Sequence, residues 1–195
     1  GEIYSFATGK AGLNKKIQLS LDCVQINKQL SASTVSKSMV FQAIIESKEA
    51  KGFILNLGFR DNTKGFLKFS AEEQALKKGD LITVSVKSVD QVSKVLKCEL
   101  ISESNRQECV HQSETVTATQ MKPGFMVSGK VSKMYENGVE ISFLGGITAT
   151  CFIDHLAEDI TEYKVGKKCN ARIIGVDSVA KKITVSMLDS ILNWT

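Results

Sequence analysis

Short runs of alternating or β-branched apolar residues, separated by turn residues, recur along the chain. This pattern is typical of β-strands, because the apolar residues of an amphipathic helix recur every three or four positions instead. In the first half of the chain it predicts strands at residues 39–46, 53–57, 66–69, 82–89 and 95–101. In the second half it predicts strands at residues 126–134, 139–143, 150–153, 169–176 and 183–188. Between the third and fourth strand of each set lies a polar stretch, at residues 71–78 and 156–163, that suits a short helical turn.

The two sets of strands belong to an internal repeat. The run KSMVFQAIIESKEAKGFILNLG aligns with PGFMVSGKVSKMYENGVEISFL and places Gly52 opposite Gly138, a period of 86 residues. Further on, KKGDLITVSVKSVDQVSKVLKCEL aligns without a gap with KVGKKCNARIIGVDSVAKKITVSM. Near the N-terminus KKIQLSL is similar to KKITVSM, so we expect the chain to begin with the tail of a preceding unit.

Each repeat has the elements of a small closed barrel. Five short strands with a helical turn between the third and fourth are what a partly open Greek-key barrel of the OB type requires. The polar residues 105–120, rich in Ser, Thr and Gln, are typical of a linker. The sequence therefore predicts an all-β chain with a tail and linker at 1–33, a five-stranded OB-fold barrel at 34–104, a polar linker at 105–120 and a second barrel at 121–195. One arrangement open to residues 1–30 is a hairpin against the first full barrel.

Composition narrows the class of protein. The chain has 195 residues, 43% hydrophobic and 24% charged, which is ordinary for a globular protein and excludes a disordered or collagen-like one. It has neither an apolar stretch long enough for a membrane span nor an N-terminal secretory pattern, so we expect it to be soluble; a signal elsewhere in a longer parent chain stays open. Five widely spaced cysteines without a Cys-x-x-Cys pair, and only two histidines, predict reduced thiols, an intracellular protein and no metal site. We expect Cys98 and Cys169 to act as small buried hydrophobes and His111 to be a solvated linker residue.

Charge gives little support for strong nucleic-acid binding. The net charge is +4 and the pI about 8.7, below the strongly basic range of many nucleic-acid binders. No predicted segment departs from neutrality by more than two charges. Any binding of anions must therefore come from local patches.

Several motifs together resemble a known family. Residues 124–187 carry three such motifs: Gly-Phe-x-Val-x-Gly-x-Val, a glycine in the second strand, and Gly-x-x-x-x-Ala-x-Ile-x-x-Val-Asp-x-x-x-Lys-Lys-Ile-x-x-Ser. Together they resemble an S1 RNA-binding domain. Further motifs are the runs KKIQLSLDCVQINKQLSA, GFLKF, PGFMVSGKV and SFLGGITA, with His155-Leu156. They make nearly the whole chain similar to consecutive S1 repeats of the programmed cell death protein 11 family of pre-rRNA processing factors. The resemblance implies a nuclear and nucleolar protein for ribosome biogenesis, with single-stranded pre-rRNA and other pre-ribosome assembly proteins as partners. It implies no cofactor, small-molecule substrate or membrane.

The resemblance also suggests where RNA lies. S1 domains bind single-stranded RNA on strands two and three, with two aromatic residues, a histidine, and an aspartate followed four positions later by a basic residue. Rings stack bases and cations hold phosphates. The aromatic positions fall on Lys51 and Ile54 in the first barrel and on Asn137 and Glu140 in the second, so neither barrel keeps a ring there. The candidate RNA-binding residues carried over or next to these positions are Lys51, Lys68, Asp90, Lys94, Asn137, Phe152, Asp177, Lys181 and Lys182.

Each of these assignments has an alternative. The strip of Lys51, Lys68 and Lys94 is either an RNA contact or a solvated barrel wall. Phe152, like Lys68 in the first barrel, falls on the histidine position. Its ring either stacks a base or turns into the core. Glu140, on the same face, would repel a phosphate group. Asp90 and Asp177 suit a cap of the turn between the last two strands better than an RNA contact. Three further residues that would offer rings if they face outward are Phe53, Tyr135 and Phe143.

Three functions follow from the sequence. The leading hypothesis is an RNA-binding module of a long S1 array that contacts pre-rRNA weakly and gains affinity through many repeats. The alternative is a set of degenerate repeats that act as a protein-interaction scaffold or spacer during pre-ribosome assembly. An enzyme is disfavoured, because the sequence offers no catalytic residues: it has no nucleophile near a histidine, no phosphate-binding glycine loop and no clustered carboxylates.

Overall fold

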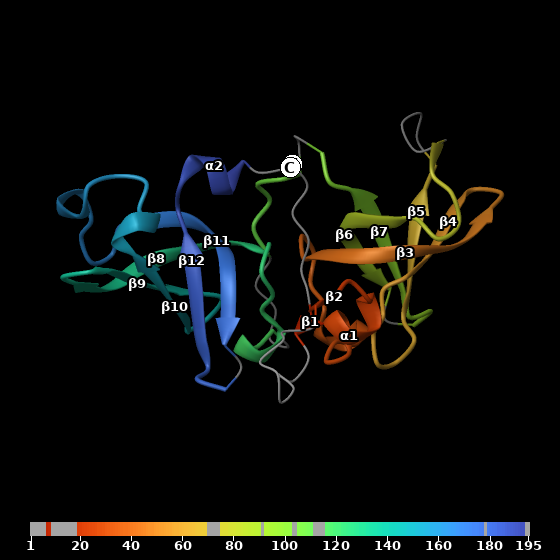
Figure 1. The fold of residues 1–195 in the computed structure, drawn as a ribbon, viewed down its shortest axis with the longest axis horizontal. Helices are drawn as coiled ribbons and strands as arrows, with labels where there is room; N and C mark the ends of the chain where they lie inside the picture. Colours follow the sequence, from red (N-terminus) through yellow and green to blue (C-terminus); the bar gives the residue numbers. More distant parts are fainter. Residues whose placement is uncertain are drawn as a thin grey trace. The chain divides into compact units, whose positions relative to one another are not determined.

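The computed structural model describes residues 7–8, 19–69, 75–90, 92–102, 105–110, 116–177 and 179–193. The chain divides into two compact units, one formed by Gly1–Val35 with Val40–Ile101 and the other by Ser36–Met39 with Ser102–Thr195 (Figure 1). Each unit contains one closed five-stranded barrel. The predicted all-β fold of two tandem OB-type barrels is therefore confirmed.

The first barrel closes in the order β3-β4-β5-β7-β6. Its strands are β3 (Val40–Glu49), β4 (Gly52–Asn56), β5 (Lys64–Lys68), β6 (Leu81–Asp90) and β7 (Val95–Leu100). Neighbours pair antiparallel except β5 and β7, which run parallel with Phe66 opposite Lys97. All five predicted strands are present, within a few residues of the expected bounds. The predicted helical turn at 71–78 lies partly outside the described residues.

A short helix covers one part of the first barrel. The helix α1 (Cys23–Asn27) begins after Asp22, whose side chain accepts a hydrogen bond from the Val24 N–H. From its last residue, Asn27 Nδ2 donates to the carbonyls of Leu57 at 2.9 Å and Gln42 at 3.4 Å. Upstream, β1 (Ala7–Thr8) and β2 (Leu19–Ser20) pair antiparallel, and η1 (Ala32–Thr34) follows α1. The described part of the tail is thus a small strand pair followed by a helix that contacts β3.

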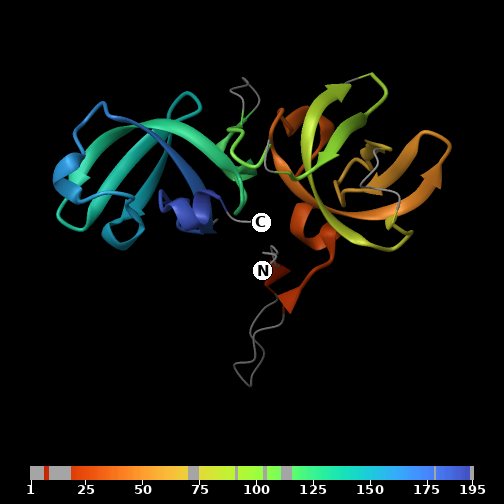
Figure 2. The same cartoon turned by 90° about the horizontal axis from the view of Figure 1, so that it is seen from above.

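The second barrel closes in the order β10-β12-β11-β8-β9. Its strands are β8 (Met126–Tyr135), β9 (Gly138–Phe143), β10 (Ile147–Phe152), β11 (Lys168–Asp177) and β12 (Lys182–Ser186). Its helical turns are η3 (Ala118–Gln120), η4 (Ile153–His155), η5 (Ile160–Glu162) and α2 (Asp189–Leu192). The predicted turn at 156–163 is realised in η5. Seen from a second direction, each set of strands curls around its own interior (Figure 2).

Residues predicted as a linker contribute to the second unit. The Val110 N–H donates to the Met126 carbonyl at 2.8 Å, and both Val110 and Val116 are buried. These valines are two of the few apolar residues in a polar stretch, so burying them on the barrel is favourable. His111 lies outside the described residues.

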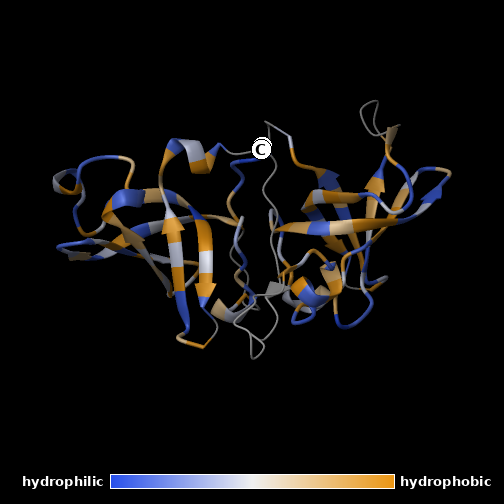
Figure 3. Cartoon of the chain, in the orientation of Figure 1, coloured by the Kyte–Doolittle hydropathy of each residue, from blue (hydrophilic) through white to orange (hydrophobic). Residues whose placement is uncertain are grey.

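Alternation along the strands builds both cores (Figure 3). In β4 the side chains of Phe53 and Leu55 are fully buried, whereas Ile54 between them is only half-buried. Successive residues of a strand point to opposite faces, so this alternation sorts each strand into a core face and an outer face. Among the described residues, no helix is long and apolar enough to cross a membrane.

All five cysteines are free. Cys98 is buried as predicted, and burial raises the pKa of its thiol to about 12. Cys169 is only half-buried, because it lies next to the start of β11 at the rim of the barrel. In the described part of the chain, no three His, Cys, Asp or Glu side chains come together as a metal site would need.

Candidate nucleic-acid interface

The outer face of β4, β5 and β7 carries an aromatic side chain among lysines. The register places Ile54 opposite Phe66, and Phe66 opposite Lys97. The adjacent residues Leu55, Leu67 and Leu96 on these strands are buried, so these three side chains point outward. One row further along, Gly52 lies opposite Lys68, which is exposed.

The Phe66 ring lies over the backbone of Gly52. A Cβ added to Gly52 would be 2.8 Å from Cζ of Phe66 and 2.2 Å from the Leu67 carbonyl oxygen, so only glycine allows this approach. The ring is half-buried. Exposed Lys97 lies opposite it on β7, and exposed Lys68 lies two residues further along β5. An accessible ring bordered by cations is the arrangement that stacks a base and holds its phosphates. Sequence reasoning missed Phe66, although it lies in the GFLKF run two residues before the predicted Lys68.

The predicted strip of three lysines is divided between two ends of β5. Lys51 and Lys68 lie together, since Lys51 precedes Gly52, the partner of Lys68. Lys94 instead precedes Val95, the partner of Lys64 at the other end of β5. Four residues of extended chain separate Lys64 from Lys68, or about 13 Å at roughly 3.3 Å per residue. The structure therefore joins Lys51 and Lys68 near Phe66 and leaves Lys94 apart.

The two Asp-x-x-x-Lys motifs form turns. One carboxylate oxygen of Asp90 accepts hydrogen bonds from the backbone N–H groups two and three residues on, at 3.0 and 3.2 Å. Asp177 does the same at 2.9 and 2.8 Å. Hydrogen bonds from Ser93 lower the pKa of Asp90. Lys94 and Lys181 have φ of 52° and 54°, the left-handed conformation that closes each turn. The interpretation of the two aspartates as turn caps is confirmed, because one oxygen of each carboxylate accepts two backbone hydrogen bonds.

In the second barrel the exposed rings stand one row away from the Phe66 position. Tyr135 of β8 lies opposite Gly138 of β9, which lies opposite Phe152 of β10. Tyr135 is 45% exposed and Phe152 is 42% exposed. The alternative in which Phe152 turns into the core is therefore wrong. Asn137, in the turn before Gly138, is exposed, and its carbonyl accepts a hydrogen bond from the Ile153 N–H at 2.9 Å.

Phe53 and Phe143 do not offer exposed rings. Their side chains are 0% and 3% exposed. Both residues stand at strand positions whose side chains point into the core. Phe53 packs edge-to-face on Phe69, with ring centroids 5.0 Å apart. Lys48 Nζ lies 5.4 Å from the centroid of the Phe69 ring. These aromatic residues stabilise the first barrel and, in the case of Phe143, the core of the second.

Glu140 is less of an obstacle to anions than the sequence suggests. Its carboxylate accepts a hydrogen bond from Ser132 Oγ at 2.9 Å and lies 3.5 Å from Lys133 Nζ, with only 19% of its side chain exposed. The lysine and the carboxylate thus offset each other on this face.

Lys181 and Lys182 lie far from Phe152. The parallel pair Thr150 and Thr184 sets the register between β10 and β12. Lys182 lies two residues before Thr184, whereas Phe152 lies two residues after Thr150. The two are therefore about 13 Å apart along the strands at roughly 3.3 Å per residue. The structure does not gather Phe152, Lys181 and Lys182 into one site.

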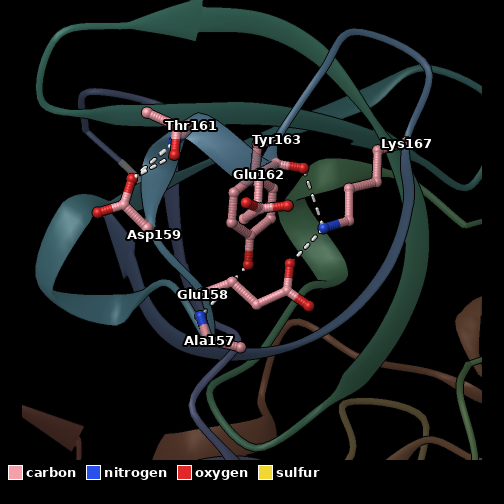
Figure 4. Close-up of polar contacts among 7 residues, drawn as sticks. All are labelled: Ala157, Glu158, Asp159, Thr161, Glu162, Tyr163 and Lys167. Carbon is pink, nitrogen blue, oxygen red and sulfur yellow. Dashed lines mark hydrogen bonds and ion pairs between the residues drawn. The ribbon is translucent and has the colours of Figure 1, made fainter.

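The segment after β10 is held by its own polar contacts (Figure 4). Lys167 Nζ lies 4.4 Å from the centroid of the Tyr163 ring, forms an ion pair with Glu158 and donates to the Glu162 carbonyl at 3.2 Å. The hydrogen bond to Glu158 raises the pKa of Lys167, and burial raises the pKa of Tyr163. The Ala157 N–H donates to the Tyr163 hydroxyl at 3.3 Å. These contacts fix the segment and engage the carboxylate of Glu158.

No arrangement suited to catalysis stands out among the described residues. Cys151 lies four residues before His155, and its Sγ donates a hydrogen bond to the His155 backbone oxygen at 3.3 Å. Burial raises the pKa of this thiol to about 12, which leaves it protonated at neutral pH. The His155 ring contacts Ser186 Oγ at 3.1 Å, but Ser186 is completely buried.

Comparisons with known proteins find relatives over most of the chain. No family model matches. The chain is 28% identical over 182 residues to the rRNA biogenesis protein RRP5 of Arabidopsis thaliana, which covers 89% of the chain and 9% of the relative. It is 22% identical over 151 residues to the human RRP5 homologue, covering 73% of the chain and 8% of the relative. The chain thus spans less than a tenth of these relatives. The resemblance to S1 repeats of the programmed cell death protein 11 family, which is the RRP5 family, is confirmed.

Solved structures with partial similarity are also found. One is the complex of a/eIF2alpha, aDim2p and rRNA from Pyrococcus horikoshii, with a TM-score of 0.33 and 25% identity, covering 35% of this chain and 45% of that chain. Another is a multidomain protein with nucleic acid binding domains from Streptococcus pneumoniae, with a TM-score of 0.30 and 13% identity, covering 90% of this chain and 56% of that chain.

Proposed function

We propose that this chain, which is similar over most of its length to RRP5 proteins, is an RNA-binding part of a ribosome biogenesis factor in the nucleus and nucleolus. It contacts single-stranded pre-rRNA weakly and works together with other repeats and with other pre-ribosome assembly proteins. The observation that carries this proposal is the outward Phe66 ring over Gly52, with Lys68 and Lys97 beside it.

The chemistry of this face accounts for weak binding. One ring stacks one base, which is worth about 1–3 kcal/mol. Lys51, Lys68 and Lys97 form no ion pair within the described part of the chain and are exposed, so they are available to phosphates. Such contacts weaken as salt rises, because binding releases counterions from the RNA.

Weak modules gain affinity when they are joined. Two repeats on one chain raise the effective concentration of the second site once the first is occupied. A face with one ring and a few cations is therefore sufficient in a long array, although it is not sufficient alone.

The test is fluorescence anisotropy of labelled oligouridine against the whole chain at about 50 and 200 mM salt. We expect Phe66→Ala to weaken binding about 5- to 150-fold, the equivalent of about 1–3 kcal/mol. Lys68→Ala should reduce the slope of log affinity against log salt by about one. Val92→Ser is the matched control, because Val92 is 95% exposed and lies in the turn at the other end of the face. No binding at low salt, or a Phe66→Ala variant that binds as tightly as the parent, would refute the proposal.

The scaffold alternative has a specific observation in its favour. Asn137 and Glu140 occupy the aromatic positions of the second barrel, and Glu140 pairs with Lys133 instead of facing RNA. A scaffold repeat would cross-link in cells to protein and not to RNA.

A further inference from the structure

Four large side chains are exposed at one end of the second barrel. They lie near the turn between β8 and β9, and we refer to them as the tip patch: Met134, Tyr135, Phe152 and Ile153, which are 37%, 45%, 42% and 52% exposed. Met134 lies opposite buried Val139, so it points to the other side of β8 from Tyr135. Tyr135 and Phe152 share a row across Gly138, and the hydrogen bond from the Ile153 N–H to the Asn137 carbonyl brings η4 to the turn. Exposed apolar groups that cluster in this way usually mark an interaction site.

The residue between Tyr135 and Phe152 in the tip patch is a glycine. Neighbouring strands lie about 4.8 Å apart, so the Cα atoms of Tyr135 and Phe152 are about 10 Å apart on either side of Gly138. No side chain rises from the middle strand at this row. A Cβ on Gly138 would lie 2.2 Å from the Cys151 carbonyl oxygen, so the position admits only glycine. The two aromatic residues thus stand on either side of a position without a side chain, where an apolar side chain of a partner can approach.

The border of the tip patch is acidic. Glu136 in the turn and Asp154 in η4 are exposed, and neither forms an ion pair with any described residue. The nearest lysine along β8, Lys133, lies beside Glu140. A polyanion is therefore repelled here, whereas a basic segment is attracted.

The corresponding end of the first barrel has the opposite character. The repeat alignment and the strand registers place Lys48, Lys51 and Lys68 where the second barrel has Met134, Asn137 and Phe152. Three lysines of the first barrel thus correspond to two apolar residues and one polar residue of the second barrel. The two barrels accordingly present surfaces suited to different partners.

The backbone beneath the tip patch is fixed. The Met187 N–H donates to the His155 carbonyl at 2.8 Å, and Leu156 is buried directly after η4. The contacts of Lys167 with Glu158 and Tyr163 hold the segment that follows. Because the rings stand on an ordered backbone, little conformational entropy is lost when a partner binds.

We propose that the tip patch binds a polypeptide segment of a partner protein that presents an aromatic or aliphatic anchor next to Lys or Arg. Tyr, Phe and Met are enriched in protein interfaces, where a few such residues carry most of the binding energy. The anchor lies between Tyr135 and Phe152, and the basic residues face Glu136 and Asp154. This site is independent of the RNA face of the first barrel.

The test begins with selection of a phage-displayed random peptide library on the whole chain. The selected peptides are then synthesised with a fluorescent label, and their affinities are measured by anisotropy. We expect the peptides to carry an apolar residue close to Lys or Arg. A Tyr135→Ser/Phe152→Ser variant should bind them at least tenfold more weakly, and a Glu136→Lys/Asp154→Lys variant should show a similar loss. Val179→Ser is the control, since Val179 is 94% exposed and lies in the turn at the other end of the barrel.

Two results would overturn the proposal. One is a selection that yields no peptide whose binding depends on Tyr135 and Phe152, or only acidic peptides. The other is a tenfold loss of oligouridine affinity in the Tyr135→Ser/Phe152→Ser variant, which would make the tip patch an RNA-stacking surface. Melting curves of each variant show that the substituted surface residues leave the fold intact. If the RNA proposal at Phe66 fails, the peptide measurements still decide this proposal.

Discussion

Arg172 joins four backbone carbonyls of the second unit, and replacing it tests how this unit is held together. Its Nη1 donates to the Gly124 carbonyl at 2.7 Å, and its Nε donates to the Ile191 carbonyl at 2.9 Å. Its Nη2 donates to the carbonyls of Leu192 at 2.7 Å and Arg106 at 3.0 Å. Burial and then the charge of Arg106 lower the pKa of Arg172 to about 10, so the guanidinium stays charged at neutral pH.

The expected loss of stability follows from these four bonds. In an Arg172→Met variant the Gly124 carbonyl loses its donor in a fully buried position, which costs about 1–3 kcal/mol. The other three bonds are only partly buried, so water can replace the donor and each costs about 1 kcal/mol or less. Relief of the buried charge offsets part of this sum. We expect a net loss of about 3–4 kcal/mol for the second barrel.

The assay must report on each barrel separately. Hydrogen exchange measured by mass spectrometry over a urea series gives the opening free energy of β8 and β11, with β3 and β6 as an internal reference. Arg172→Lys should lose about half as much, because a single ammonium cannot reproduce the planar fork of donors. Arg106→Met is the control, since Arg106 Nη1 donates to the Asn193 carbonyl in an exposed bond. A loss below about 1 kcal/mol for Arg172→Met, or equal losses for the two methionine variants, would refute the reasoning.

Three further predictions concern a carboxylate, two thiols and a glycine. Burial alone would raise the pKa of Asp61, but hydrogen bonds, first among them that from Thr63, lower it. The ionised carboxylate therefore stabilises the fold at pH values above its unfolded pKa of about 3.9, and this stabilisation is lost as the pH falls through the lower folded pKa. In Asp61→Asn the unfolding free energy, measured by urea denaturation at a series of pH values, should fall less steeply in acid than in the parent. Cys98 and Cys151, with pKa raised to about 12, should react with iodoacetamide at pH 8 at least about a hundredfold more slowly than a free thiol. Gly138→Ala, at φ 150° and with its Cβ 2.2 Å from a carbonyl oxygen, should lower the unfolding free energy by about 2–4 kcal/mol, measured by urea denaturation.

Each of these three predictions has a contrary result. An acid limb that is as steep in Asp61→Asn as in the parent would show that other groups set the pH dependence. Alkylation of Cys98 as fast as that of a small thiol would contradict its burial. Gly175→Ala serves as the control for Gly138, because its Cβ would meet nothing closer than 3.8 Å. Equal effects of the two alanines would contradict the argument from close approach.

Local patterns along the chain predict the strands, the repeat and the turns. The apolar residues Phe53 and Leu55 alternate with Ile54, and this period of two is visible in sequence because it depends only on neighbouring residues. The role of Asp90 as a turn cap is equally local, since its carboxylate reaches N–H groups only two and three residues away.

Which residues share a face was decided by pairing between distant strands. The parallel register of β5 with β7 brings Lys97 to Phe66 and leaves Lys94 at the far end, and no pattern along the sequence contains that register. The registers of β9 with β8 and with β10 likewise set Tyr135 and Phe152 on either side of Gly138, and the pairing of β4 with β5 brings Phe66 over Gly52. Alternation is a property of one strand, whereas a binding face is made by side chains from three strands whose alignment depends on the packing of the whole barrel.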